Sequence, residues 1–180
     1  MKKIIFLLTF VISSHLWASN HSLDSTIDKH QSEFENVAMT IWDLAEVGYQ
    51  EYESSKLLQN SLKDHGFKIQ TNVADIPTAF IAEYGSGSPI IAILGEFDAL
   101  PGVAQSASPF KEPYKDNQAG HACGHHLFGA GSAWSSVVIK DWMKANNIKG
   151  TIRFYGTPAE EGGSGKVYMT RAGLFNDVDV

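Results

Sequence analysis

The chain has 180 residues, of which 43% are hydrophobic and 19% are charged, a composition typical of a globular protein that buries a core. This length suits one domain or part of a larger one. The formal net charge of -6 at pH 7 argues against nucleic-acid binding, because no basic stripe is available to neutralise phosphates.

The N-terminus has the layout of a secretory signal peptide. Two lysines precede an apolar run over Ile4–Ile12, and a polar stretch then ends at Ala18. A membrane anchor is the alternative, but this run is too short to span about 30 Å of hydrocarbon. We therefore expect residues 1–18 to be cleaved, the mature chain to be exported to the periplasm or secreted, and no stable membrane span to remain.

Helical periodicity marks two segments in the first part of the mature chain. Apolar residues that lie three, four and seven positions apart predict a helix from Ser25 to Val47, with Gly48 as its stop. A second helix is predicted for Ser54–His65, followed by Gly66 as the terminator. The apolar face of the first helix consists of Ile27, Phe34, Val37, Ala38, Ile41, Leu44 and Ala45.

Three predicted strands follow these helices. The first has the alternating sequence FKIQTNV, and the next two, TAFIAEY and PIIAILG, flank the turn sequence GSGS, which predicts a hairpin. The strand PIIAILG is apolar at nearly every position, which predicts a central strand covered on both faces. A long irregular stretch, Glu96–Gly120, comes next, and such loops are usually functional in compact domains.

The rest of the chain predicts a helix over His126–Ala145, a strand with the sequence GTIRFYG and a helix in GSGKVYMTRAGLF. The buried side of the first of these helices is predicted to hold Leu127, Ala130, Trp134, Val137, Val138 and Met143. This mixture predicts an α/β fold for residues 19–180, with a mixed, largely parallel sheet flanked by helices. Acidic pairs follow two of the strands, at the sheet edge where functional groups gather in open α/β sheets.

The only cysteine of the chain, Cys123, lies in the sequence GHACGHHLFGAGS. Exported proteins usually carry cysteines in pairs, so this thiol is an exposed liability, a buried bystander or a coordinated ligand. A thiolate and an imidazole at the spacing of Cys123 and His125 can bind one divalent ion, because Gly124 permits a tight backbone. For an isolated motif, a buried cysteine beside a solvated histidine is an equal alternative.

Two acidic pairs favour the metal interpretation. Glu160 and Glu161 lie in GTPAEEGGSG, where no helix or strand requires them, and the simpler alternative is a solvated loop edge. In a metal site one carboxylate would bind the ion and the other would serve as the base for the attacking water. Glu96 and Asp98 face the same way on extended backbone, and Asp98 either binds the metal, orients a ligand histidine or merely forms a turn.

A nucleophilic pair of Cys123 and His125 is the main rival interpretation, since a helix start after the cysteine would lower the pKa of the thiol. However, partners two residues apart rarely reach attack geometry, and this chemistry leaves the glutamate pair unexplained. The sequence GGSGK resembles a phosphate-binding loop but lacks its first glycine and its final serine or threonine.

Three motifs in order, ILGEFDALPG, GHACGHHLFGAGS and GTPAEEGGSGKVYMTRAGLFNDVD, resemble the signatures of the aminoacylase and carboxypeptidase-type metallopeptidases. The match is to their amidohydrolase branch, which uses a C-G-H motif, and it covers about residues 25–180. The resemblance implies that Cys123, His125 and Glu161 are metal ligands. It also implies that Glu160 is the general base and that Asp98 is the supporting aspartate.

In this family the site is dinuclear, usually with zinc or manganese, and it hydrolyses an amide bond next to an amino-acid carboxylate. The implied substrates are N-acyl or aminobenzoyl amino acids or small peptides. Glu96 stands where many relatives have a ligand histidine, so we leave it out of the ligand set, and we do not expect His126 to be a ligand.

Family members are longer, with further ligand histidines and a smaller dimerising domain, whereas no histidine follows His126 here. We therefore expect a truncated catalytic domain that is inactive and poorly stable as 180 residues, and a homodimer at full length. The alternatives are a non-catalytic metal or peptide binder and one half of a two-chain enzyme. The binder predicts metal affinity without turnover even when the missing half is supplied, and the enzyme predicts that this complementation restores hydrolysis.

Overall fold

The structure is a computed structural model that describes residues 24–112 and 119–180. The predicted signal peptide, residues 1–18, lies outside the described residues. Among the helices in the described part, none is both long enough and apolar enough to cross a membrane.

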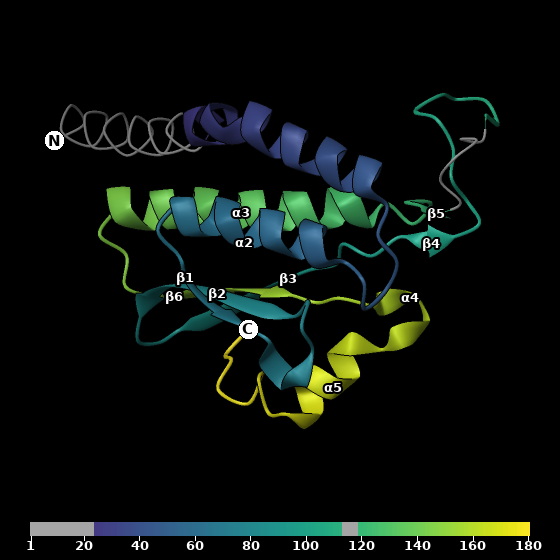
Figure 1. Ribbon diagram of the computed structural model, residues 1–180. Coiled ribbons are helices and arrows are strands. Elements are labelled where there is room, and N and C mark those ends of the chain that lie inside the picture. Colours follow the sequence, from purple (N-terminus) through teal and green to yellow (C-terminus); the bar gives the residue numbers. More distant parts are fainter. Residues whose placement is uncertain (1–23, 113–118) are drawn as a thin grey trace, which may run out of the picture.

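Three helices of the described chain lie on one side of the sheet (Figure 1). They are a helix over residues 24–44, α2 (Tyr52–Asp64) and α3 (His125–Ala145). These three of the four predicted helices are confirmed, and their apolar faces form the main core with the sheet. Leu127 is an exception, because it is 61% exposed in the first turn of α3. The core residues from these helices include Phe34, Val37, Ile41, Leu58, Leu62, Ala133 and Val137.

A four-stranded mixed sheet forms the centre of the fold. Its strands, β1 (Lys68–Thr71), β2 (Phe80–Ser86), β3 (Ile90–Gly95) and β6 (Gly150–Gly156), lie in the order β1-β2-β6-β3. The predicted α/β class with a mixed sheet flanked by helices is thus confirmed. The expectation that the sheet is largely parallel is wrong for this sheet, since β3 and β6 pair in parallel but β1–β2 and β2–β6 are antiparallel.

The predicted hairpin between β2 and β3 is also wrong. After β3 the chain crosses over through α3 and returns as β6, which inserts between β2 and β3 and pairs with both. Consequently β6 is a buried inner strand, whereas β3, predicted as a central strand, is half-buried at the edge of the four. The outer side of β3 meets the C-terminal residues, where the Ala92 N–H donates to the Val180 carbonyl at 2.8 Å.

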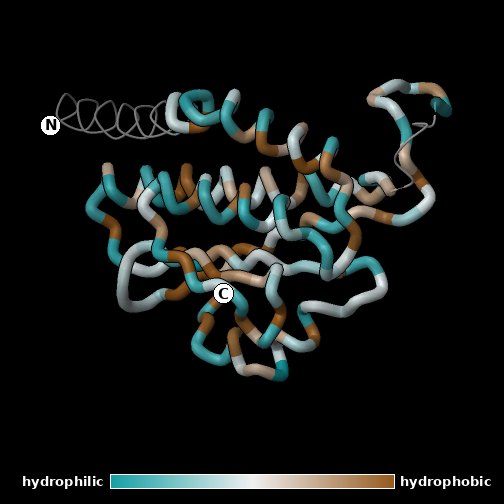
Figure 2. Tube along the Cα trace, in the orientation of Figure 1, coloured by the Kyte–Doolittle hydropathy of each residue, from teal (hydrophilic) through white to brown (hydrophobic). Residues whose placement is uncertain are grey.

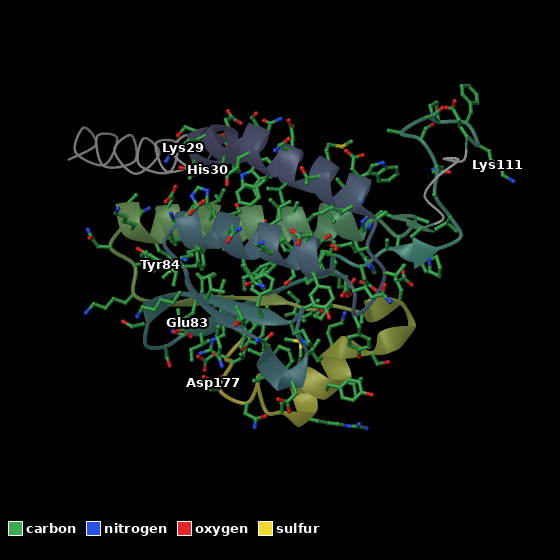
Figure 3. The ribbon with its side chains drawn as sticks, in the orientation of Figure 1. Lys29, His30, Glu83, Tyr84, Lys111 and Asp177 are labelled. Atoms are coloured by element: carbon green, nitrogen blue, oxygen red, sulfur yellow. The ribbon has the colours of Figure 1, made fainter. Side chains whose placement is uncertain are left out.

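The other side of the sheet carries a smaller second layer. The short helices η1 (Val73–Asp75) and α5 (Gly165–Arg171) lie there (Figure 1), around a second hydrophobic cluster that includes Tyr155 and Met169. Glu83 and Asp177 lie on this side in Figure 3, and Arg153 forms ion pairs of 2.8 Å with both. Figure 2 shows hydrophobic segments in the strands and along the helices, consistent with burial on both sides of the sheet.

The long segment predicted as irregular, Glu96–Gly120, contains a short antiparallel ladder. It consists of β4 (Leu100–Pro101) and β5 (Ala119–Gly120), and residues 113–118 between them lie outside the described residues. This ladder brings the chain from the end of β3 to the start of α3. Because β3 and β6 are parallel, their carboxyl ends, the start of α3 and the turn α4 (Glu160–Gly163) meet at one end of the sheet (Figure 1).

We expect the close packing of α3 on this end of the sheet to require glycine at position 129. A Cβ there would lie 2.6 Å from the Glu96 carbonyl oxygen, so Gly129→Ala should lower the free energy of unfolding by about 1–3 kcal/mol. Gly131 is the matched control in the same helix, because nothing lies within 4 Å of its added Cβ. Gly131→Ala should raise stability by up to ~1 kcal/mol through helix propensity. Urea denaturation measures both, and equal effects of the two variants would contradict the packing.

Candidate functional site

His125 is the first residue of α3 and lies at the centre of the cluster of acidic residues. Its Nδ1–H donates to the Asp98 carbonyl oxygen and to Asp98 Oδ1, each at 3.0 Å. Because a carbonyl oxygen can only accept, Nδ1 carries the proton, and Nε2 is turned toward the remaining acidic residues. The hydrogen bond that His125 donates to Asp98, together with the negative charge of Asp98, raises the pKa of His125 against the effect of burial.

Three carboxylates surround the Nε2 atom of His125. Glu96 Oε2 lies 2.9 Å away, Glu160 Oε2 lies 3.8 Å away and Glu161 Oε1 lies 3.9 Å away. The first follows β3 and the other two follow β6, so the parallel pair of strands brings them together as the sequence predicted. This concentration of negative charge around one nitrogen favours a cation at its centre.

Asp98 connects His125, at the start of α3, with the turn that carries Glu161. It is 1% exposed, and while Oδ1 accepts from His125, Oδ2 accepts from the backbone N–H of Glu161 at 2.8 Å. Burial raises the pKa of this carboxyl, but the hydrogen bonds from His125 and Glu161 outweigh burial and leave the pKa below its usual value. Asp98 therefore lies behind His125 and fixes the orientation of its ring rather than facing the open side.

The sulfur of Cys123 completes a set of metal-binding atoms. One ligand atom each of Cys123, His125 and Glu161 lie within 4.8 Å of one another, and Glu96, His125 and Glu160 form an overlapping group. Gly124, between the cysteine and the histidine, has φ +82°, which glycine adopts without strain. Glu161 Oε1 is buried without a hydrogen-bond partner, so the set fits a divalent ion such as zinc, which binds sulfur, nitrogen and oxygen.

The reactivity of the exposed Cys123 thiol in the metal-free chain depends on the acidic residues around it. Glu161 beside it, with Glu160 and Glu96 further away, raises the pKa of the thiol. Since the thiolate is the reactive form, we expect alkylation to be slower than that of free cysteine at neutral pH and to accelerate as the pH rises. Zinc should slow the reaction further. Glu161→Gln should accelerate it without metal, and an unchanged rate in that variant would contradict the placement of the thiol.

Glu96 is a residue of the cluster that sequence reasoning left out of the ligand set. Besides its contact with His125, it forms an ion pair with Lys166, the lysine of GGSGK, at the start of α5. The signal for Glu96 was its spacing from Asp98 on extended backbone. The sequence marked Lys166 only through the resemblance of GGSGK to a phosphate-binding loop, and no pattern predicted its contact with Glu96.

The neighbouring histidines have other surroundings. His126 is buried against Trp42, with ring centroids 4.9 Å apart, and burial followed by the charges of His121 and His125 lowers its pKa to about 4. His121 donates from Nε2 to the Ile41 carbonyl oxygen at 3.0 Å. In the part of the chain that the structure describes, neither histidine belongs to a group with metal-binding spacing.

His30, Glu33 and His65 form a second group with such spacing, and His30 lies far from this end of the sheet in Figure 3. Its polar atoms already have partners. His30 contacts Asp141 Oδ2 at 2.9 Å, His65 contacts Glu33 Oε2 at 2.9 Å, and the Ser61 hydroxyl donates to Glu33 at 2.8 Å. These contacts form a hydrogen-bond network that joins three helices and already engages each of the three side chains.

Comparisons with known proteins place the chain among metallohydrolases. The model of peptidase family M20/M25/M40 matches residues 92–180. One of the subunits of the p-aminobenzoyl-glutamate hydrolase of Escherichia coli is 41% identical over 158 residues, which are 87% of this chain and 33% of that protein. The N-acetylcysteine deacetylase of Bacillus subtilis is 31% identical over 145 residues, 79% of this chain and 37% of that protein.

Solved structures agree with this similarity. A dinuclear metal-binding peptidase of the M20 family from Bacillus subtilis superposes with a TM-score of 0.62 at 29% identity, covering 82% of this chain and 41% of that one. The chain thus spans about a third of the length of the curated relatives it matches.

Proposed function

We propose that this chain, which belongs to peptidase family M20/M25/M40, forms the metal-binding N-terminal part of an amidohydrolase catalytic domain. The observation that carries the proposal is the convergence of Cys123, His125 and Glu161 within 4.8 Å at the carboxyl ends of two parallel strands. Glu160 lies next to this set, on its exposed side.

In the proposed mechanism Cys123, His125 and Glu161 would hold zinc or manganese. A divalent cation in this place would polarise the amide carbonyl and lower the pKa of the attacking water. Asp98 keeps the His125 ring in one orientation and fixes the backbone at Glu161 through its two oxygens. Glu160 accepts the proton of the attacking water and later transfers it to the leaving amine, as a general base and then a general acid.

We propose N-acyl or aminobenzoyl amino acids and small peptides as the substrate class. The names of the relatives support this class, since one acts on p-aminobenzoyl-glutamate and another on N-acetylcysteine. A second metal ion at the site and a homodimer are part of the same proposal. Export is proposed from the sequence of residues 1–18 alone.

A chimera with the Escherichia coli relative tests the enzymatic proposal. Residues 24–180 of this chain replace the matching third of the p-aminobenzoyl-glutamate hydrolase chain, and release of p-aminobenzoate from p-aminobenzoyl-glutamate is measured with added zinc or manganese. We expect the chimera to hydrolyse the substrate. A chimera that folds and binds metal without turnover would instead support a non-catalytic metal or peptide binder.

A further inference from the structure

We infer that Glu51, a buried carboxylate outside the metal cluster, is a positioning residue that holds the turn carrying Glu160 and Glu161. Glu51 is 0% exposed, and its Oε1 accepts the backbone N–H of Ala159 at 2.7 Å. Ala159 directly precedes the two glutamates. The inference rests on the proposed function, because that function gives the turn a ligand and a base to place.

The conformation of Ala159 explains why the turn needs such a contact. Ala159 has φ +55° and ψ +43°, a left-handed conformation that is unfavourable for any residue with a Cβ. Residues in this region persist when their surroundings hold them there. Ala159 is fully buried, and a Cβ added at Gly48 would lie 3.1 Å from it, so the packing leaves the turn little room to relax.

Glu51 is available for this contact because another residue caps its helix. Glu51 occupies the N-cap position of α2, where an acidic side chain usually accepts the first free N–H groups, but it makes no cap hydrogen bond. Glu46 does so instead, accepting the N–H of Glu53 at 3.1 Å and the N–H of Ser54 at 2.8 Å. The side chain of Glu51 is thereby free to turn inward, toward β2 and the end of β6.

The second oxygen of Glu51 also accepts a hydrogen bond. Thr78 donates its hydroxyl to Glu51 Oε2 at 3.1 Å, and the Thr78 carbonyl accepts the hydroxyl of Ser55 at 2.7 Å. Two buried carboxylates, Glu51 and Asp98, therefore accept hydrogen bonds from the backbone of the turn on either side of Glu160. Glu51 accepts the N–H of Ala159, and Asp98 accepts the N–H of Glu161.

Two substitutions of similar size separate this hydrogen bond from simple packing. Glu51→Gln keeps an oxygen for the Ala159 N–H, and its NH2 group can face the Thr78 hydroxyl, which accepts hydrogen bonds as well as donating them. Glu51→Met fills the same space without an oxygen acceptor. Ser61→Ala, at the other end of α2, removes a hydrogen bond to Glu33 and controls for general destabilisation.

The zinc dissociation constant of the folded chain, measured against a competing chelator, is the first readout. We expect Glu51→Met to weaken zinc binding roughly ten-fold, the lower end of the effect of residues that support metal ligands. The zinc affinity of Glu51→Gln should stay much closer to that of the unsubstituted chain, and the zinc affinity of Ser61→Ala should equal that of the unsubstituted chain. Unchanged affinity in Glu51→Met, or equal losses in the Gln and Met variants, would overturn the inference.

Amide hydrogen exchange of the unsubstituted chain is the second readout, and it requires neither metal nor a variant that folds. The amides of Ala159 and Glu161 should be protected, because each donates to a buried carboxylate. Where Glu51→Met folds, protection at Ala159 should fall while the amides of β6 stay protected. An Ala159 amide that exchanges like an unprotected one would overturn the inference. Protected amides in a chain that binds no zinc would contradict the proposed function and leave the role of Glu51 intact.

Discussion

Replacing Glu160 with glutamine should reduce amide hydrolysis by about 10²–10⁴-fold while the metal remains bound, because a general base typically contributes that much. The amide of glutamine cannot accept a proton from the attacking water at neutral pH. Glu160 is the most exposed of the carboxylates around His125, and its oxygen lies 3.8 Å from Nε2. The measurement compares turnover of the chimera with and without the substitution, alongside metal content by elemental analysis.

Glu161→Gln is the matched comparison, since it makes the same chemical change at the adjacent residue. It should lower both metal content and turnover, because Glu161 is the proposed ligand. If Glu160→Gln also loses the metal, or if it retains turnover within a few-fold, the division of roles between the two glutamates is wrong.

Asp98→Asn should weaken metal binding by about 10–100-fold, the range typical of residues that orient metal ligands. Both oxygens of Asp98 accept hydrogen bonds, one from His125 Nδ1 and one from the N–H of Glu161. An asparagine offers one oxygen, so its NH2 group must face a donor on one side. Either the histidine ring or the turn with Glu161 then loses its fixed position.

Asp177→Asn controls for the loss of a carboxylate elsewhere. Asp177 is exposed on the opposite side of the sheet and pairs with Arg153, so its replacement should leave metal affinity unchanged. Isothermal titration of zinc into the three proteins measures the difference. Equal affinities of the Asp98→Asn variant and the unsubstituted chain would show that Asp98 does not support the ligands.

Much of the site followed from local sequence. The C-G-H motif, the acidic pair after GEF and the pair in GTPAEEGGSG were each visible as residue types that lack a structural reason to be there. Their convergence followed from one rule, that the carboxyl ends of parallel strands share an edge, and β3 and β6 are the parallel pair. The helices were predictable because their apolar periodicity is a local property.

The order of the strands was not predictable in the same way. The turn GSGS between β2 and β3 favours a hairpin locally, but α3 carries the chain back so that β6 inserts between these strands. The contacts of Glu96 with Lys166 and of Glu51 with Ala159 join residues far apart in the sequence. Such contacts depend on how the layers pack, and no periodicity or spacing encodes them.

The most direct test of the proposed metal site is the metal content of the purified chain, measured by elemental analysis beside a Cys123→Ser variant. A serine hydroxyl stays protonated at neutral pH and is a poor substitute for a thiolate ligand. We expect about one zinc or manganese ion per chain, as a site with three protein ligands and an open position would hold, and loss of that ion in the variant. Equal metal content in both proteins, or none in either, would contradict the assignment of Cys123, His125 and Glu161 as ligands that suffice to bind an ion.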